Sequence, residues 1–151
     1  MGTWGITIFE DDSAYEYYDS FCEFFLSVEE LEEAFDIVLS TEYDMNKLLV
    51  QNAFLEPVRA LVYAEIMAKA LGKPVATFPS EDYHRNWELQ KIDFDKISKY
   101  LNDDLLQKAI DTVNKIKTDK HIHYTLLWVE SDYYEEWQAY LDDLITRLSF
   151  S

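Results

Sequence analysis

Apolar residues recur at helical spacing along much of this chain. One stretch lies within residues 28–39 and another within 103–117. Recurrence every three or four residues is typical of an amphipathic helix, with one face against a core. We therefore expect two helices, whose buried faces hold Leu31, Ala34, Phe35, Val38 and Leu39 in the first and Leu105, Leu106, Ala109, Ile110, Val113 and Ile116 in the second.

Two short motifs indicate where helices begin. Ser13 is followed three residues later by Glu16, and Ser27 by Glu30. This spacing forms a capping box, in which each side chain satisfies a backbone N–H of the other residue. It predicts a helix over about 14–26 and the start of the helix that follows Ser27. The preceding segment 1–9 is expected to be short and irregular, packed under the fold.

The segment 56–71 is apolar on nearly every side, which places a helix at the centre of a bundle. Pro57 suits a first turn, and Gly72 with Pro74 indicates the end of the helix. After Glu56 at its start, the segment is broken only by Arg59, Glu65 and Lys69.

The rest of the chain predicts shorter helices and a long final one. We expect one or two short helices in 81–100, with a break near Asp93, and another at 124–129. The last helix has Ser131 as its N-cap and carries Tyr133, Tyr134 and Trp137 inward. With three Gly and three Pro in 151 residues, turns are few. We predict one all-α domain over residues 1–151, a compact helical bundle.

Charge is unevenly distributed. The net charge is −17, made up of −13 in residues 1–58, +1 in 59–129 and −5 in 130–151. Such a field repels nucleic acid and anionic membranes and attracts cationic partners. The lone Cys22 suits a reducing compartment, and we see no signal peptide or apolar run of membrane-spanning length. We expect a cytoplasmic protein that binds neither nucleic acid nor membrane.

The opening residues Thr3-Trp4-Gly5, Phe9, Asp12 and Ala14 match a TWG-x-x-x-F-x-x-D-x-A pattern. The chain thereby resembles a widespread bacterial family of unknown function. The segment from Arg59 to Gly72 is similar to the family's Ala-rich central helix, and Leu127 to Leu144 to its C-terminal helix. The resemblance implies a single helical domain and carries over no catalytic residues.

Candidate catalytic and metal-binding groups are sparse. Cys22 lacks the surroundings of a nucleophile. Glu81 and His84 have the Glu-x-x-His spacing of di-iron bundles but lack the second such motif that these sites need. His121 and His123 fit a polar turn better than a metal site, and the acids Glu10 to Asp12 fit a helix N-terminus. We therefore expect no metal, no cofactor and no enzymatic activity.

Acidic and aromatic side chains are interleaved near both ends of the chain. Exposed tyrosines among acids are typical of protein interfaces, because tyrosine buries a large area at low entropic cost and acids steer a basic partner. The candidate partner-binding residues are Tyr15, Glu16, Asp19, Glu23, Asp132, Tyr133, Glu135 and Glu136.

These features favour an acidic binding protein that neutralises a basic partner. The role we expect is immunity, which is the inhibition of a nuclease-like toxin that is basic because it binds phosphate. The alternative is a small regulatory or housekeeping domain that self-associates, as a homodimer, through its aromatic face. A DNA mimic and an enzyme are less favoured; the mimic would need acids spaced along one elongated face.

Overall fold

The computed structural model describes Ile8 and residues 28–40, 50–77, 94–120 and 122–149. Every regular element longer than one residue in this part of the chain is an α-helix, so the predicted all-α bundle is confirmed. The helices are α2 (Val28–Ser40), α3 (Val50–Ala70), α4 (Phe94–Tyr100), α5 (Asp103–Thr118), α6 (His123–Val129) and α7 (Tyr134–Leu148).

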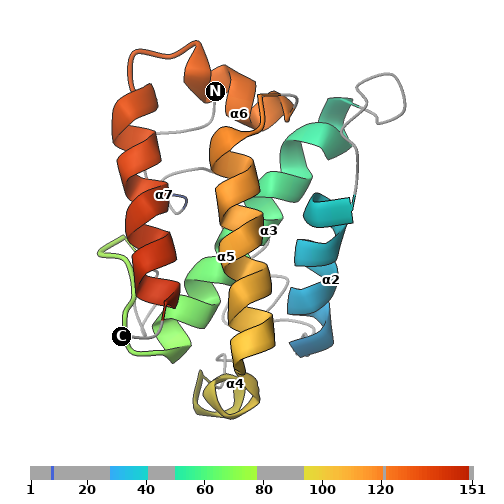
Figure 1. The fold of residues 1–151 in the computed structure, drawn as a ribbon, viewed down its shortest axis with the longest axis vertical. Coiled ribbons are helices and arrows are strands. Elements are labelled where there is room, and N and C mark those ends of the chain that lie inside the picture. The colour runs from blue at the N-terminus through green and yellow to red at the C-terminus, as the bar shows by residue number, and fades with distance from the viewer. Residues whose placement is uncertain (1–7, 9–27, 41–49, 78–93, 121, 150–151) are drawn as a thin grey trace, which may run out of the picture.

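The helices are arranged around α3 and α5 (Figure 1). α5 runs between α2 and α7, and α3 crosses behind all three. α6 lies across one end of this layer and α4 across the other. The α6–α7 turn and α4 are therefore at opposite ends of the molecule.

One hydrophobic core takes residues from all six helices and from Ile8. From Val58 to Ala68, α3 is buried at every position except Arg59. This confirms the central position predicted for the segment 56–71. The predicted faces of α2 and α5 are also confirmed, with Leu39 and Ile110 only half-buried.

The expected start of α3 was wrong. The helix begins at Val50, so Pro57 lies inside it rather than in its first turn. An interior proline removes one backbone hydrogen bond and costs roughly 3 kcal/mol. Pro57 is itself buried, and tertiary packing of the segment offsets that loss.

The predicted end of α3 is confirmed. Gly72 has φ of 79°, a left-handed conformation that glycine adopts without a side-chain clash. Its N–H donates to the carbonyl of Lys69 at 2.9 Å, and the N–H of Lys73 donates to that of Ala68 at 2.9 Å. Together these two bonds form a Schellman motif, which satisfies the last carbonyls of the helix.

Two lysines of α5 hold α2 in place. Lys108 Nζ lies 2.7 Å from Glu32 Oε1 and 2.9 Å from Asp36 Oδ1. Lys115 Nζ donates to the carbonyls of Val38 at 2.8 Å and Leu39 at 3.3 Å. Because α2 has no basic residue in its own last turn, Lys115 supplies the cation that its C-terminal end favours.

The start of α7 differs from the prediction. The helix begins at Tyr134 with Tyr133, not Ser131, at the N-cap position. Ser131 Oγ instead accepts a hydrogen bond from the N–H of Tyr133 at 3.2 Å and donates to the carbonyl of Trp128 at 2.7 Å. The serine thus stabilises the turn between α6 and α7.

Other predictions lie outside the described residues. These are the helix over 14–26, the irregular segment 1–9 apart from the buried Ile8, and the part of 81–100 that precedes α4. The second short helix of that region is observed as α4, directly after the break expected near Asp93.

Candidate functional site

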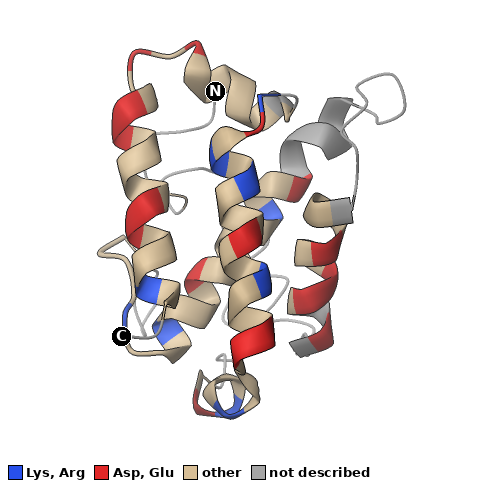
Figure 2. Cartoon of the chain, in the orientation of Figure 1, with Lys and Arg blue, Asp and Glu red and all other residues tan. Residues whose placement is uncertain are grey.

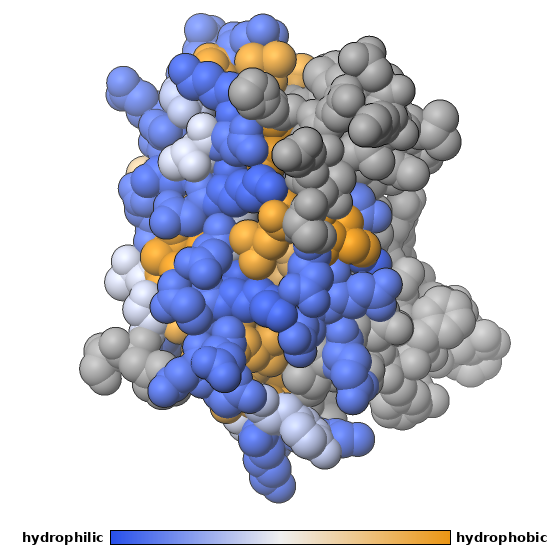
Figure 3. Space-filling model, turned by 45° about the vertical axis from the view of Figure 1, so that its right-hand side comes forward, coloured by the Kyte–Doolittle hydropathy of each residue, from blue (hydrophilic) through white to orange (hydrophobic). Residues whose placement is uncertain are grey.

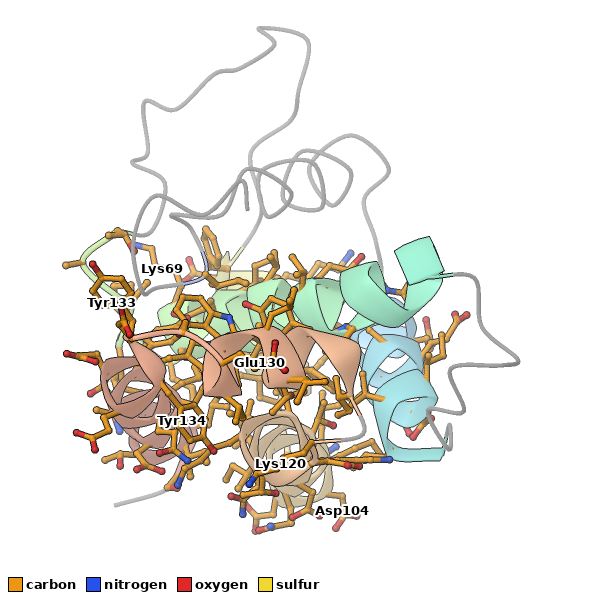
Figure 4. The ribbon with its side chains drawn as sticks, turned by 90° about the horizontal axis from the view of Figure 1, so that it is seen from above. Lys69, Asp104, Lys120, Glu130, Tyr133 and Tyr134 are labelled. Carbon is orange, nitrogen blue, oxygen red and sulfur yellow. The ribbon has the colours of Figure 1, made fainter. Side chains whose placement is uncertain are left out.

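Four of the predicted binding residues meet where α6 passes into α7. Asp132, Tyr133, Glu135 and Glu136 are all exposed, and Glu130 at the end of α6 is exposed beside them. We call these five residues the acidic corner. Figure 4 looks down on this end of the molecule and labels Glu130 and Tyr133 of the corner and the neighbouring Tyr134.

Tyr133 is the most exposed large hydrophobic residue in the described part of the chain, with 59% of its surface accessible. The expectation that the last helix carries Tyr133 inward was wrong. Because Tyr133 lies at the N-cap, one residue before the helix, its side chain is not part of the buried stripe. Tyr134 is half-buried, and the two tyrosines leave the corner on different sides (Figure 4).

An aromatic cluster supports the corner from beneath. The rings of Trp128 and Trp137 stack with centroids 5.5 Å apart and an interplanar angle of 6°. Tyr134 lies 6.2 Å from Trp137 on centroids, and Tyr124 meets it edge-on at 6.0 Å. Trp128, Tyr124 and Trp137 are buried, so the backbone that presents Tyr133 rests on a closely packed base.

No described residue neutralises the carboxylates of the corner. Among the residues that the structure describes, none of Glu130, Asp132, Glu135 and Glu136 has an ion-pair partner. Further along α7 the situation is different, since Asp142 pairs with Lys117 at 2.5 Å and Asp143 with Arg147 at 2.8 Å.

Figure 2 shows how acidic and basic residues are distributed along α7. Acidic residues occupy the first turn of α7 in Figure 2, whereas its last turn carries a basic residue. Figure 3 shows one face whose described surface is mostly hydrophilic, with smaller apolar areas. The corner is one of several acidic places in the described part of the chain, since α2 carries exposed acids and the first turn of α5 carries Asp103 and Asp104.

The other predicted half of the site lies outside the described residues. Tyr15, Glu16, Asp19 and Glu23 all precede α2, in the segment 9–27. Their joint role with the corner stays a prediction. Cys22, Glu81, His84 and His121 also lie outside the described residues, and within the described part no group of three His, Cys, Asp or Glu side chains could hold a metal ion.

A buried polar network, not predicted from the sequence, joins α3 to the second half of α7. Glu65 is fully buried. Its two carboxylate oxygens accept hydrogen bonds at 2.8 Å from Arg147 Nη1 and Nη2, and Oε1 also accepts one at 2.8 Å from the Tyr140 hydroxyl. Arg147 donates further to Asp143 at 2.8 Å and to the carbonyl of Lys73 at 3.2 Å.

The network shifts the acid–base properties of its members. Burial, the charge of Glu65 and the hydrogen bond to it raise the pKa of Tyr140 well above its ordinary value. Burial acts to lower the pKa of Arg147, but hydrogen bonds and attraction to Glu65 and Asp143 outweigh it, so that the pKa is raised. Arg147 stays charged and Tyr140 neutral, as the observed hydrogen bonds require.

Two features of the sequence signal this pair in retrospect. Glu65 is the only charged residue in the otherwise apolar stretch 60–68, and Arg147 is the only basic residue in 130–151. A charge within a central helix needs a partner. A single base among six acids at the C-terminal end is a natural candidate, although nothing in a local pattern connects residues so far apart.

Comparison with known proteins identifies a family. The family model described as domain of unknown function DUF4259 matches residues 2–140. Because the match covers most of the chain, the protein belongs to this family. No curated protein and no solved structure matches the chain. Separately, none of the described helices is both long and apolar enough to cross a membrane.

Proposed function

We propose that this member of an uncharacterised family is an acidic binding protein that captures a basic protein through its acidic corner. The observation that carries the proposal is the exposed ring of Tyr133 among four carboxylates that lack ion-pair partners in the described part of the chain. An unpaired acid can form a new ion pair with a partner without first breaking one of its own.

The two kinds of side chain have complementary roles. The carboxylates raise the rate of encounter with a positively charged surface and reject acidic partners. Tyr133 supplies contact area, and residues of this type dominate interface energies when a partner covers them. The stacked Trp128 and Trp137 support a rigid presentation, which lowers the entropic cost of binding.

The partner that fits best is a nuclease-like toxin, with the chain as its cytoplasmic immunity protein. A nuclease presents lysines and arginines to hold phosphate. An acidic protein competes for the same groups. The net charge of −17 and the resemblance to a bacterial family support this role.

The exposed aromatics favour a different partner over self-association. In the described part of the chain, the large hydrophobic residues that are exposed are Tyr133, at the α6–α7 corner, and Tyr100, which is 54% exposed at the end of α4 (Figure 1). They lie at opposite ends of the molecule and form no shared aromatic face. Each is therefore a separate contact, and only Tyr133 lies within the acidic corner.

The test is capture of partners from the native host with tagged protein, followed by association kinetics at several salt concentrations. We expect a basic protein whose nuclease activity is inhibited by the chain, with an on-rate that falls steeply as salt rises. Exposed charges are screened within about 8 Å at physiological ionic strength. Recovery of only neutral or acidic proteins, or an on-rate that ignores salt, would reject the proposal.

A further inference from the structure

The Glu65–Arg147 pair lies away from the acidic corner, because Arg147 is on the second half of α7 and Glu65 is on α3. A buried ion pair is weak evidence for stability, because removing two charges from water offsets much of their attraction. Apolar residues of similar volume often serve the core equally well. The pair therefore calls for an explanation other than stability, and its geometry offers one.

We propose that Glu65 and Arg147 are positioning residues that fix the register of α7 on α3, and thereby the placement of the acidic corner. Tyr140 and Arg147 lie two turns apart on α7, about 10.5 Å along its axis, yet both reach the same carboxylate. Arg147 also binds the carbonyl of Lys73, beyond the end of α3. A shift of one turn, about 5.4 Å, would break this set of contacts.

Apolar packing alone does not fix this register. Leu141, Leu144 and Leu148 are fully buried and lie three and four residues apart, so a shift of three or of four residues brings one leucine onto the place of another. The hydrophobic effect is non-directional and discriminates weakly between such arrangements. Trp137 is distinctive, but its closest ring contact is with Trp128 of the adjoining α6.

The geometry of arginine makes the pair selective. Its planar guanidinium binds both oxygens of Glu65 in one orientation, with Nε directed to Asp143. A lysine at this position would keep the charge but act as a point charge with no fixed orientation. A substitution by lysine can therefore separate the effect of the charge from the effect of the fixed orientation on the register.

The experiment compares stability with conformational uniqueness in the whole chain. The double variant Glu65→Met/Arg147→Leu removes both charges. Arg147→Lys keeps the positive charge but removes the planar guanidinium that binds both oxygens of Glu65. The surface pair Lys117–Asp142, which joins α5 to α7, provides the control variant Lys117→Gln/Asp142→Asn. Melting temperature reports stability, and the indole N–H NMR signals of Trp128 and Trp137 report how many arrangements the corner adopts.

We expect the double variant to melt within about 4 °C of wild type or above it. Both it and Arg147→Lys should show split or exchange-broadened signals from Trp128 and Trp137, whereas the control variant keeps one sharp signal for each. Unchanged sharp signals in Arg147→Lys would overturn the proposal. A double variant that fails to fold would also overturn it, because the pair would then be needed for stability itself.

A consequence for binding rests on the proposed function. If the corner captures a basic partner, Arg147→Lys should weaken binding although residue 147 does not belong to the corner. The indole signals need no partner and test the register alone. Failure of the proposed function would therefore leave those signals split, whereas failure of the register inference would leave them sharp and binding unchanged.

Discussion

Arg147 donates hydrogen bonds to both carboxylate oxygens of Glu65, 82 residues away in sequence, with each N···O distance at 2.8 Å. Glu65 is fully buried and the Arg147 side chain is 12% exposed. Loss of the Glu65 charge therefore leaves the largely buried Arg147 with Asp143 as its one remaining ion-pair partner among the described residues. The neutral variant Glu65→Gln should lower the free energy of unfolding by about 3–5 kcal/mol, the usual cost of breaking a buried pair. Urea unfolding measures this.

The surface pair Lys117–Asp142 is the control for that prediction. The Asp142 side chain is 58% exposed, so Asp142→Asn should cost no more than about 1 kcal/mol. If Glu65→Gln were as mild as Asp142→Asn, the buried network would not hold α7 to α3.

Tyr140 predicts a loss of stability in alkaline solution. Its pKa is raised in the folded protein, so its contribution is fully present below the ordinary tyrosine pKa of about 10 and is lost as pH rises from there through the raised value. Tyr140→Phe should cost about 1.5–3 kcal/mol near neutrality, because the hydroxyl donates to a charged group. The difference from wild type should shrink above pH 10.

The measurement is urea unfolding of both proteins between pH 8 and pH 11.5, values chosen to span the ordinary tyrosine pKa of about 10. Other tyrosines and lysines titrate in both proteins, and their effects cancel in the difference. A difference that stays constant across this range would mean that Tyr140 ionises normally.

The central helix should be intolerant of truncation. Leu61 and Ile66 of α3 are fully buried. Leu61→Ala and Ile66→Ala should each lower the free energy of unfolding by about 2–5 kcal/mol, the sum of lost burial and a residual cavity. Wild-type stability in both variants would contradict the central position of α3.

Tyr133 should govern the lifetime of the complex. We predict that Tyr133→Ala raises the off-rate by about 30-fold, which corresponds to the roughly 2 kcal/mol of an interface hot spot. Tyr100 is its matched control, since it is 54% exposed and lies at the other end of the molecule. Equal effects of Tyr133→Ala and Tyr100→Ala on surface-plasmon dissociation curves would place the contact elsewhere.

Periodic patterns were enough to predict several elements. The spacing of apolar residues predicts α2, α5 and the body of α7, and Gly72 marks the end of α3. Start signals were less reliable. Proline and serine both favour the first positions of helices. Packing nevertheless extends α3 to the N-terminal side of Pro57, and Ser131 forms its hydrogen bonds within the α6–α7 turn.

The acidic corner could be predicted from local sequence, whereas the Glu65–Arg147 pair could not. Tyr133, Glu135 and Glu136 were predicted together because they are neighbours in sequence, and a short turn with one helical turn keeps neighbours together in space. Glu65 and Arg147 were missed because their pairing depends on how α7 packs on α3, which no local pattern contains. Long-range polar pairs need the fold before they can be identified.

We propose that the acidic corner, rather than the overall charge, steers the partner. Glu135 and Glu136 in the first turn of α7 have a close counterpart in Asp103 and Asp104, exposed acids in the first turn of α5 at the opposite end. Reversing either pair to lysine changes net charge and helix-dipole interactions equally.

The decisive measurement is the association rate of each double variant with the captured partner at low salt. We predict that Glu135→Lys/Glu136→Lys slows association by at least about tenfold, while Asp103→Lys/Asp104→Lys stays within about twofold of wild type, because steering depends most on charges near the contact. Equal slowing by the two variants would contradict the account and leave the negative charge as a property of the whole surface.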